Sequence, residues 1–364
     1  STLDRSSAAS DVYKRQVQGE PDKKAKANAW QTAIGLQDVD GLKPSEYLIK
    51  TAVQHIEGDI TIDQVKDMLD TYYETKDVRE HPDDERTEEA DKVSARITEI
   101  LSEQSFSFTP DYLLRIHRRL FEGIYKHAGK LRDVNITKKE WVLSGDTVLY
   151  SNYDMLRETL EYDFEQEKKT DYSVLNADMA VKQICKFVSG IWQIHPFREG
   201  NTRTTAVFTM KWLQTFGFSV DNDVFKDNSW YFRNALVRAN YNNIPKRIFA
   251  TSEYLELFFR NLLFGEQNKL SNRTMLAGEL QSATAEVSKS QNDTLDGTLN
   301  CNLDELALLR FVKENPGATQ IEIAKHIGKS ERTVKRMTPA LIERGLLERE
   351  NGKRNGKWIV KCEI

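Results

Sequence analysis

The 364-residue sequence predicts a mainly α-helical protein that contains one β-hairpin and ends in a smaller mixed unit. Apolar residues recur at helical spacing through most of the chain, a pattern typical of amphipathic helices packed around a core. Residues 130–150 break this rhythm with two β-prone runs around a turn. Residues 303–364 combine short helical patterns with two short β-prone runs. These observations favour a helical main domain followed by a second unit.

Composition indicates a globular protein in a reducing compartment. Hydrophobic residues make up 39% of the chain and charged residues 30%, a balance typical of soluble domains. The net charge of −4 gives no global attraction to nucleic acid or anionic membranes. Cys185, Cys301 and Cys362 are far apart and odd in number, which argues against a disulfide framework or a zinc site. Without a membrane-spanning run or a visible secretory signal, we expect a cytoplasmic protein with no membrane partner.

The most informative stretch runs from His195 to Ala206. Apolar residues at helical spacing lead up to it over residues 181–192, and Pro196 ends that helix. A second helix is expected from Thr202 to Phe216. The N-terminus of this second helix has free backbone N–H groups and the positive end of the helix dipole, so the loop between the helices is a predicted anion site.

The side chains of this loop extend the prediction from anion binding to chemistry. Gly200 lets the backbone approach a ligand closely, and Asn201 and Arg203 add hydrogen-bond donors. Glu199 can hold a divalent cation, and His195 titrates near neutrality and is a natural general base. Together they indicate transfer of a nucleotide or phosphoryl group. The alternative is a helix cap with a chance histidine.

The stretch from His195 to Ala206 also resembles the signature of the Fic (filamentation induced by cAMP) family, His-x-Phe-x-(Asp/Glu)-Gly-Asn-Gly-Arg-x-x-Arg. The resemblance implies an all-helical fold and transfer of AMP from ATP to a Tyr, Thr or Ser hydroxyl of a target protein, the chain itself included. It implies that His195 deprotonates the hydroxyl, that Phe197 anchors the loop and that Glu199 binds Mg²⁺. The residues it assigns to the ATP phosphates are Arg198, Gly200, Asn201, Thr202 and Arg203.

Two positions depart from the family signature. Thr202 replaces the second glycine, and Ala206 replaces the last arginine, which in the family contacts the terminal phosphates. Two alternatives therefore stay open. The same site could use another nucleotide or remove AMP, or the chain could be a DNA-binding regulator with a non-catalytic Fic core. The retained base, carboxylate and phosphate-binding residues argue against the regulator.

Residues 17–78 are expected to form a helical segment ahead of the main domain. Residues 1–16 are polar and unpatterned and are set aside as a tail. The stretch from Val53 to Gly58 resembles the inhibitory helix of Fic proteins, (Ser/Thr)-x-x-x-Glu-Gly, with Val53 at the Ser/Thr position. The resemblance implies that Glu57 enters the ATP site and inhibits. The alternative is a helical cap that only stabilises the main domain.

The main domain is expected over residues 79–264, with the hairpin running from about Ile136 to Tyr150 around Ser144-Gly145-Asp146. Such a hairpin could be a simple surface feature. The resemblance to Fic proteins implies instead a flap that aligns the target segment by strand addition. The candidate target contacts are Ile136, Thr137, Lys138, Lys139 and Trp141.

Two further groups of residues carry weaker predictions. An aromatic-rich helix begins near Asn228, and the resemblance to Fic proteins implies that Tyr231 and Asn234 contact the base or ribose of ATP. The alternative, favoured by composition, is that this helix belongs to the core. His117 lies on a predicted buried helix without a partner motif, so we expect it to be structural.

Residues 265–302 are expected to be a linker, and residues 303–364 look like a winged helix-turn-helix. Pro339 is expected to kink or shorten its third helix. The candidate DNA contacts are Arg332, Thr333, Lys335 and Arg336 on the third helix and Lys353 and Arg354 in the wing. The alternative is a protein-binding wing domain. The partners expected overall are a target protein with an acceptor hydroxyl, DNA, and a second copy of the chain in a homodimer.

Overall fold

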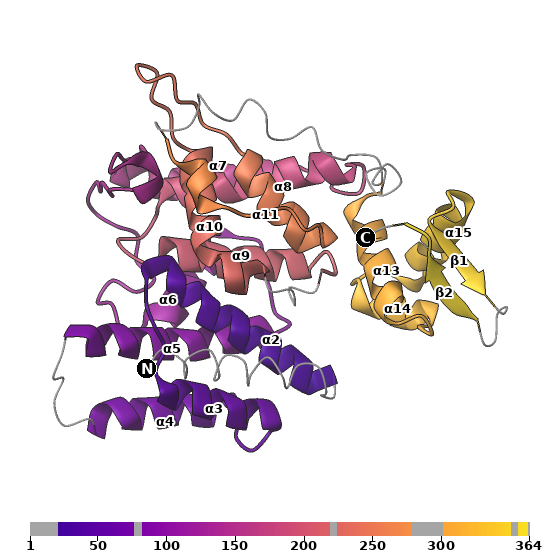
Figure 1. Ribbon diagram of the computed structural model, residues 1–364, viewed down its shortest axis with the longest axis horizontal. Coiled ribbons are helices and arrows are strands. Elements are labelled where there is room, and N and C mark those ends of the chain that lie inside the picture. Colours follow the sequence, from indigo (N-terminus) through magenta and orange to yellow (C-terminus); the bar gives the residue numbers. More distant parts are fainter. Residues whose placement is uncertain (1–20, 76–81, 219–223, 278–300, 351–355, 363–364) are drawn as a thin grey trace.

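The computed structural model describes residues 21–75, 82–218, 224–277, 301–350 and 356–362. The predicted tail and the wing residues Lys353 and Arg354 lie outside these ranges. Within them the protein is mainly helical, and its paired strands belong to the C-terminal unit (Figure 1). The mainly α-helical class predicted from the sequence is confirmed.

The N-terminal segment does not form a separate unit. Its elements are α2 (Pro21–Gly35), η1 (Leu36–Asp40), α3 (Glu46–Glu57) and α4 (Ile62–Thr75). Ser45 caps α3 by accepting from the N–H of Leu48, and Gly58 ends it at φ 88°. Helices α3 and α4 pack with Trp30 in a small apolar cluster of their own. In contrast, Leu36 and Val39 of η1 belong to the main core.

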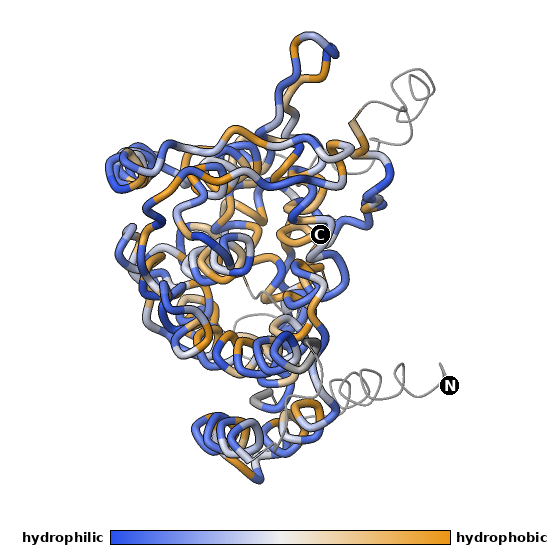
Figure 2. The backbone as a smooth tube through the Cα atoms, turned by 90° about the vertical axis from the view of Figure 1, so that its left-hand side faces the viewer, coloured by the Kyte–Doolittle hydropathy of each residue, from blue (hydrophilic) through white to orange (hydrophobic). Residues whose placement is uncertain are grey.

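The main domain packs its helices around α9. The helices are α5 (Pro82–Ser102), α6 (Pro110–Phe121), α7 (Leu156–Glu167), α8 (Ala177–Ile194), α9 (Asn201–Gln214), α10 (Val224–Ala239) and α11 (Glu253–Phe264). Every residue of α9 from Asn201 to Leu213 is buried. Hydrophobic and hydrophilic residues alternate along the surrounding helices (Figure 2), because each buries one face against this centre.

The predicted hairpin at 136–150 is wrong as a pair of strands. The chain does turn back at Ser144 and Gly145, both with positive φ, but the turn follows a short 3₁₀ helix, η2 (Trp141–Leu143), and no ladder joins its arms. The N–H of Glu140 donates across the turn to the carbonyl of Asp146 at 2.9 Å, but other backbone groups of the segment bond elsewhere. The carbonyl of Val142 accepts from the N–H of Ala277, and the carbonyl of Leu149 accepts from a side chain of α8. These tertiary partners override the local β propensity.

Residues 265–277, the first part of the predicted linker, pack against the main domain. They contain a 3₁₀ turn, η4 (Asn272–Met275), in which Met275 is fully buried. Asn272 accepts a hydrogen bond from Asn234 of α10 at 2.8 Å. Another 3₁₀ turn, η3 (Tyr153–Met155), leads into α7. Linker residues 278–300 lie outside the described ranges.

The C-terminal unit has the three-helix and two-strand order of a winged helix. It comprises α13 (Leu303–Glu314), α14 (Gln320–His326), α15 (Glu331–Glu343), β1 (Leu347–Glu350) and β2 (Lys357–Val360). The strands are antiparallel, with Leu347 opposite Val360. Of the two effects expected of Pro339, a kink or a shortening of α15, the shortening does not occur, because the helix continues to Glu343. Met337 and Leu341, on either side of the proline, are buried, and their packing offsets the missing N–H.

Helix α2 makes a close backbone contact that the fold depends on. At Gly35, an added Cβ would lie 2.4 Å from the carbonyl oxygen of Lys226 in α10. We predict that Gly35→Ala lowers the free energy of unfolding by about 1–3 kcal/mol, because one backbone must shift. Urea unfolding followed by circular dichroism measures this.

Gly190 of α8 is the matched control. It is also helical, but a Cβ there would meet only a side-chain oxygen of Asp163, at 3.2 Å. Gly190→Ala should therefore change stability by less than about 1 kcal/mol, because helix propensity favours alanine. Equal stability losses at both glycines would contradict a specific clash at Gly35.

Candidate active site

His195 ends α8 in the left-handed region, with φ 52°, which is uncommon for a residue other than glycine. Its side chain is 3% exposed and lies beside the ring of Tyr150, at 4.1 Å between centroids. Nδ1 lies 3.3 Å from the carbonyl oxygen of Trp192, which can only accept, so Nδ1 carries the proton. Nε2 is buried and has no hydrogen-bond partner among the residues that the structure describes. It therefore has a lone pair ready to accept a proton.

Burial lowers the pKa of His195 well below its ordinary value. The cationic side chains of Lys138, Arg233 and Arg132 lower it further. The imidazole is therefore neutral at physiological pH, which is the form a general base requires. The same cations make the surroundings of His195 attractive to an anionic substrate.

The N-terminus of α9 faces the same loop. Its N-cap residue is Gly200, which has φ 74° and provides no side-chain cap. The first helical hydrogen bond runs from Thr204 N to Gly200 O, so the N–H groups of Asn201, Thr202 and Arg203 have no carbonyl acceptor within the helix. A Cβ on residue 200 would lie 2.4 Å from the ring of Phe121, so glycine is needed for the close approach. This arrangement is the predicted anion site.

His117 of α6 holds the loop in place through contacts of its imidazole ring. Its Nδ1 accepts from the N–H of Gly129 at 2.8 Å, so Nε2 carries the proton and donates to the carbonyl of Glu199 at 3.1 Å. The ring stacks on Phe197 with 3.7 Å between centroids. Burial lowers the pKa of His117 to about 3. The structural role expected for His117 is therefore confirmed, and its particular task is to hold the loop.

Arg132 ties the same loop to the segment around residues 134–151. Its side chain is buried, and it donates to the carbonyls of His195 at 2.8 Å and Val134 at 2.7 Å, and also to that of Ser151. Its backbone N–H donates to the carbonyl of Pro196 at 2.9 Å. Sequence reasoning missed Arg132, because an arginine in an irregular segment carries no pattern that reveals such contacts.

The side chains predicted to bind phosphate are directed at protein partners. Asn201 bridges both backbone groups of Phe197, at 3.0 and 2.8 Å. Thr202 accepts from the indole N–H of Trp192 at 2.9 Å, and Arg198 pairs with Asp133. These contacts shape the loop. The donors left open at this position are therefore mainly backbone N–H groups.

Arg203 points into the core, where its side chain is 1% exposed. It forms ion pairs with Asp40 at 2.9 Å and Glu89 at 2.5 Å, and it donates to Gln37 at 3.1 Å. Burial alone would lower the pKa of Arg203, but the two carboxylates outweigh it and raise the pKa. The N-terminal segment and α5 thus hold this arginine of the loop motif.

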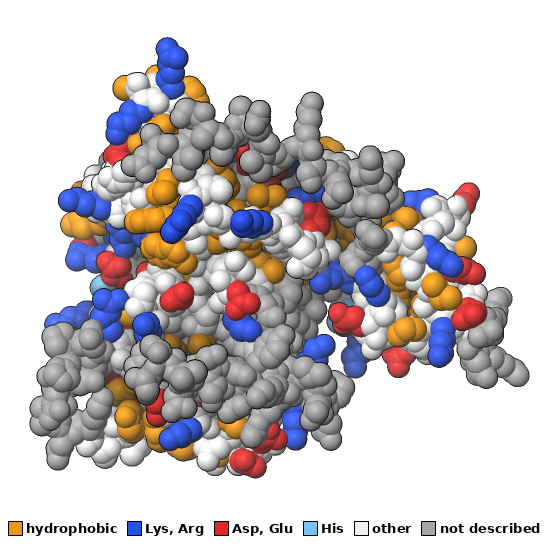
Figure 3. Space-filling model, in the orientation of Figure 1, with side chains coloured by type: hydrophobic (Ala, Val, Ile, Leu, Met, Phe, Trp, Pro, Cys, Tyr) orange, Lys and Arg blue, Asp and Glu red, His pale blue; other side chains and the backbone are white. Residues whose placement is uncertain are grey.

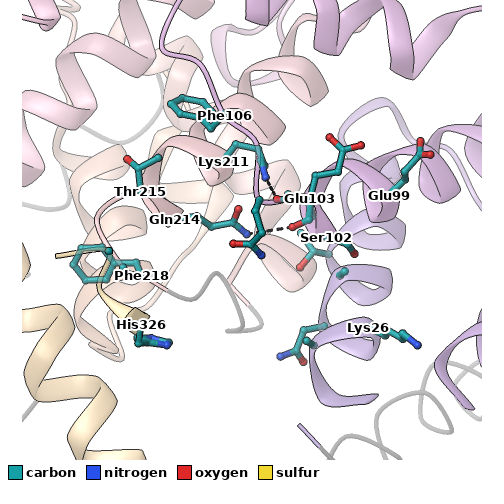
Figure 4. Close-up of a pocket in the computed structure, with 18 of the residues that line it drawn as sticks. Lys26, Glu99, Ser102, Glu103, Phe106, Lys211, Gln214, Thr215, Phe218 and His326 are labelled. Carbon is teal, nitrogen blue, oxygen red and sulfur yellow. Dashed lines mark hydrogen bonds between the residues drawn. The ribbon is translucent and has the colours of Figure 1, made fainter. Parts of the chain in front are cut away.

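Glu57 lies at the end of α3 and pairs with Lys23 of α2 at 3.3 Å. His55 and Ile62, on either side of it in the chain, line a cavity of about 870 Å³. This cavity is bounded by α2 and by the C-terminal ends of α5 and α9, with Lys211 and Gln214 on its wall (Figure 4). The loop is at the opposite end of α9. Inhibition by Glu57 stays a prediction.

Glu199 is the candidate metal ligand, with 55% of its side chain exposed. Its carboxylate pairs at 2.8 Å with Lys138 of the predicted flap, so the structure brings these two predicted residues together. The described residues contain no cluster of three His, Cys, Asp or Glu side chains that could hold a metal ion. Mg²⁺ is usually held by one or two carboxylates together with substrate phosphates, so Glu199 fits this ion as a single protein ligand.

A second network beside His195 escaped sequence reasoning. Glu140 is buried and receives two hydrogen bonds from Arg233 of α10, at 2.7 and 3.2 Å, and one from the hydroxyl of Tyr150 at 3.2 Å. Burial raises the pKa of Glu140, while Arg233 opposes the change. The network fixes Tyr150, whose ring packs on the imidazole. No sequence spacing links these residues, since they come from separate elements.

The predicted adenosine contacts lie in the core. Tyr231 is 2% exposed and donates to the carbonyl of Tyr254, and Asn234 is fully buried and donates to Asn272. Both residues therefore lie in the core, which is where the alternative interpretation of this helix placed them. Of the other predicted flap contacts, Ile136 is half-buried, and Thr137, Lys139 and Trp141 are exposed.

The predicted DNA-contacting side chains lie on α15. Arg332, Lys335 and Arg336 are exposed, and Lys335 pairs with Glu331 at 2.6 Å. Thr333 is half-buried, and its hydroxyl lies 2.9 Å from that of the N-cap residue Ser330. Among the described helices, none is both long and apolar enough to cross a membrane.

Comparisons with known proteins agree with this architecture. Residues 107–213, which include α6, α8, α9 and the loop, match the Fic/DOC family, and residues 305–348 match the winged helix-turn-helix DNA-binding family. The chain therefore contains a Fic domain followed by a winged helix-turn-helix domain.

One relative carries a described activity. The chain is 28% identical over 120 residues to the protein adenylyltransferase VbhT of Bartonella schoenbuchensis (strain DSM 13525 / NCTC 13165 / R1). The match covers 33% of this chain and 24% of the relative, so the chain spans about a quarter of that protein's length.

The buried His117 should make the fold sensitive to acid. Because its folded-state pKa of about 3 lies below the value of about 6.5 in an unfolded chain, its contribution to stability is complete above pH 6.5 and is lost as the pH falls toward 3. Between pH 7 and 5 the loss is about 2 kcal/mol. We predict that His117→Phe, which keeps an aromatic ring over Phe197, removes this part of the pH dependence.

Urea unfolding of both proteins at pH 7 and pH 5 measures the effect. The variant should be less stable at pH 7, because two hydrogen bonds are lost, but its stability should change less between the two pH values. If the loss of stability between pH 7 and pH 5 is as large in the variant as in the wild type, His117 is protonated in the folded protein.

Proposed function

We propose that this chain transfers AMP from ATP to the hydroxyl of a Tyr, Thr or Ser residue in a target protein, the chain itself included. The observation that carries the proposal is the neutral, buried His195 next to the uncapped N-terminus of α9. Within the described part of the chain, Nε2 of this histidine has no hydrogen-bond partner. The matches to the Fic/DOC family and to an adenylyltransferase support this chemistry.

In the proposed reaction the acceptor hydroxyl oxygen attacks the α-phosphorus of ATP. His195 Nε2 takes the hydroxyl proton, a bond forms between oxygen and phosphorus, and pyrophosphate leaves with the bridging oxygen. The carbonyl of Trp192 holds the Nδ1 proton and steadies the imidazolium that forms. General-base catalysis of this kind contributes roughly 10²–10⁴-fold to the rate.

The backbone N–H groups of residues 201–203 would bind the phosphates, with the dipole of α9 adding to the attraction. Glu199 would hold Mg²⁺, which when bound neutralises phosphate charge. Lys138 now pairs with Glu199, and in the proposed complex it exchanges that carboxylate for a phosphate oxygen. Ala206 provides no charge, and Arg203 is held by Asp40 and Glu89. This unusual set of donors is the reason to keep another nucleotide, or AMP removal, as the alternative.

The central test is His195→Ala. We predict that the variant loses AMP transfer at least about 100-fold, because the hydroxyl loses its base, while ATP affinity changes little, because the backbone donors remain. Incubation with labelled ATP and Mg²⁺ measures transfer to the chain or to lysate proteins, and equilibrium dialysis measures ATP binding.

Mass spectrometry of the products with ATP, GTP, CTP and UTP identifies the donor nucleotide. Glu199→Gln serves as a second variant that keeps the base but removes the proposed metal ligand, and its defect should depend on the Mg²⁺ concentration. Full AMP transfer by His195→Ala would overturn the mechanism.

We propose as a second function that the C-terminal domain binds DNA. The exposed Arg332, Lys335 and Arg336 on one face of α15 support this, as does the match to a DNA-binding family. Arg336→Ala should weaken binding to duplex DNA and reduce the slope of log affinity against log salt by about one. Fluorescence anisotropy across a salt series measures both.

Lys313→Ala is the matched control, because Lys313 is exposed on α13 of the same domain, outside the α15 face. The DNA affinity of this variant, and its slope of log affinity against log salt, should stay at the wild-type values. Binding that does not depend on salt would favour a protein-binding domain instead.

A further inference from the structure

Residues 242–250, between α10 and α11, form a projecting turn that extends away from the helices (Figure 1). Asn243 and Ile248 exchange both backbone hydrogen bonds, at 2.8 and 3.0 Å, and close the turn. The side chain of Asn242 accepts from the N–H of Ala250 at 2.9 Å, and Ile248 is buried. The turn is therefore preorganised.

The tip of the projecting turn exposes apolar and basic side chains together. Ile244 is 75% exposed and Phe249 61%, high values for large apolar residues. Lys246 and Arg247, between them in the chain, are exposed as well. Figure 3 shows hydrophobic and Lys or Arg side chains gathered on this projection. Apolar and cationic groups side by side on a fixed turn are typical of a protein-binding surface.

The projecting turn is connected to the flap segment beside the candidate active site. The hydroxyl of Tyr241, at its base, donates to the carboxylate of Asp146 at 2.6 Å. Asp146 follows the bend of the flap, and Leu149, three residues later, is 85% exposed. The next residue, Tyr150, packs on His195. A partner that covers Leu149 and the projecting turn would thus lie on the segment that packs against His195.

Cations predominate among the exposed charges of this surface. Lys139 of the flap and Lys246 and Arg247 of the turn are exposed cations. Of the nearby carboxylates, Glu140 is buried and paired with Arg233, whereas Asp146 accepts from the hydroxyl of Tyr241 and keeps its negative charge. A partner that complements this surface therefore carries acidic residues next to apolar ones.

We propose that the projecting turn and the flap form a docking surface for an acidic, apolar segment of the target protein and deliver its hydroxyl to His195. The inference rests on the proposed AMP transfer for its purpose, but the binding it describes needs no nucleotide. The exposed Ile244 and Phe249 favour a protein over a nucleic acid, which has no apolar side chains to cover them.

The test measures binding of a fluorescein-labelled glutamate–tyrosine copolymer to the full chain by fluorescence anisotropy, without ATP. The wild-type chain should bind this acidic, aromatic probe and not a lysine–tyrosine copolymer. The charge reversal Lys246→Glu with Arg247→Glu should weaken binding roughly tenfold or more. The double variant Ile244→Ser with Phe249→Ser keeps the charges, and its binding should also weaken.

The matched control is Lys168→Glu with Lys169→Glu. These adjacent lysines at the end of α7 give the same change in net charge away from the proposed surface, and binding should change by less than about twofold. An equal loss in this control would show a non-specific charge effect and overturn the proposal. Equally strong, turn-dependent binding of duplex DNA would overturn it too.

Two further measurements separate the competing outcomes. If sedimentation velocity shows that the turn variants convert a dimer into monomers while copolymer binding is unchanged, the turn is a self-association surface and the proposal fails. Transfer to lysate proteins that persists in both turn variants would also overturn the docking role. If the wild-type chain binds the copolymer but transfers no AMP, the proposed reaction is refuted and the docking surface is not.

Discussion

Arg203 carries its charge into the centre of the helical domain, where almost none of its side chain reaches solvent. Removing an ion from water costs several kcal/mol, so such a charge persists only with partners of opposite sign and good geometry. Asp40 and Glu89 provide them from two distant parts of the chain. The N-terminal segment is therefore part of the charge balance of the domain and not an accessory to it. The first turn of α9, and with it the anion site, depends on this contact.

The rest of the loop is positioned by groups that bind backbone. His117 stays neutral and holds the carbonyl of Glu199, whereas Arg132 uses its charge to gather the carbonyls of His195 and Val134. Backbone contacts of this kind set the path of the loop without occupying its outer face. These contacts use neither Nε2 of His195 nor the first N–H groups of α9. Preorganisation of this sort reduces the reorganisation that a reaction would otherwise require.

Several residues of the loop signature make contacts other than the phosphate contacts expected of them. Thr202, at a glycine position of the family signature, anchors α9 to Trp192, and Asn201 braces the loop. With these side chains committed, backbone N–H groups and Lys138 remain as donors to an anion. In the proposed reaction, the apolar and basic surface of the projecting turn would contact the target protein, and the loop would carry the chemistry. Recognition and chemistry would then come from different elements.

Most of the fold could be predicted from the sequence, because helices are determined by local periodicity and by caps such as Ser45 and Gly58. The loop, its base at His195 and the winged helix follow from the same kind of local pattern. The predicted hairpin failed where backbone groups such as the carbonyls of Val142 and Leu149 found partners in distant segments. Pro339 did not shorten α15, whose residues on both sides of the proline are buried.

What only the tertiary structure decided is which groups meet. The sequence determined that a histidine, a carboxylate and a helix N-terminus would share one loop. It could not show that Arg203 turns inward to Asp40 and Glu89, or that Arg132 and Arg233 come to lie around His195. Those contacts join residues far apart in the chain. Their energies depend on burial and on partner geometry, which arise only when the helices pack.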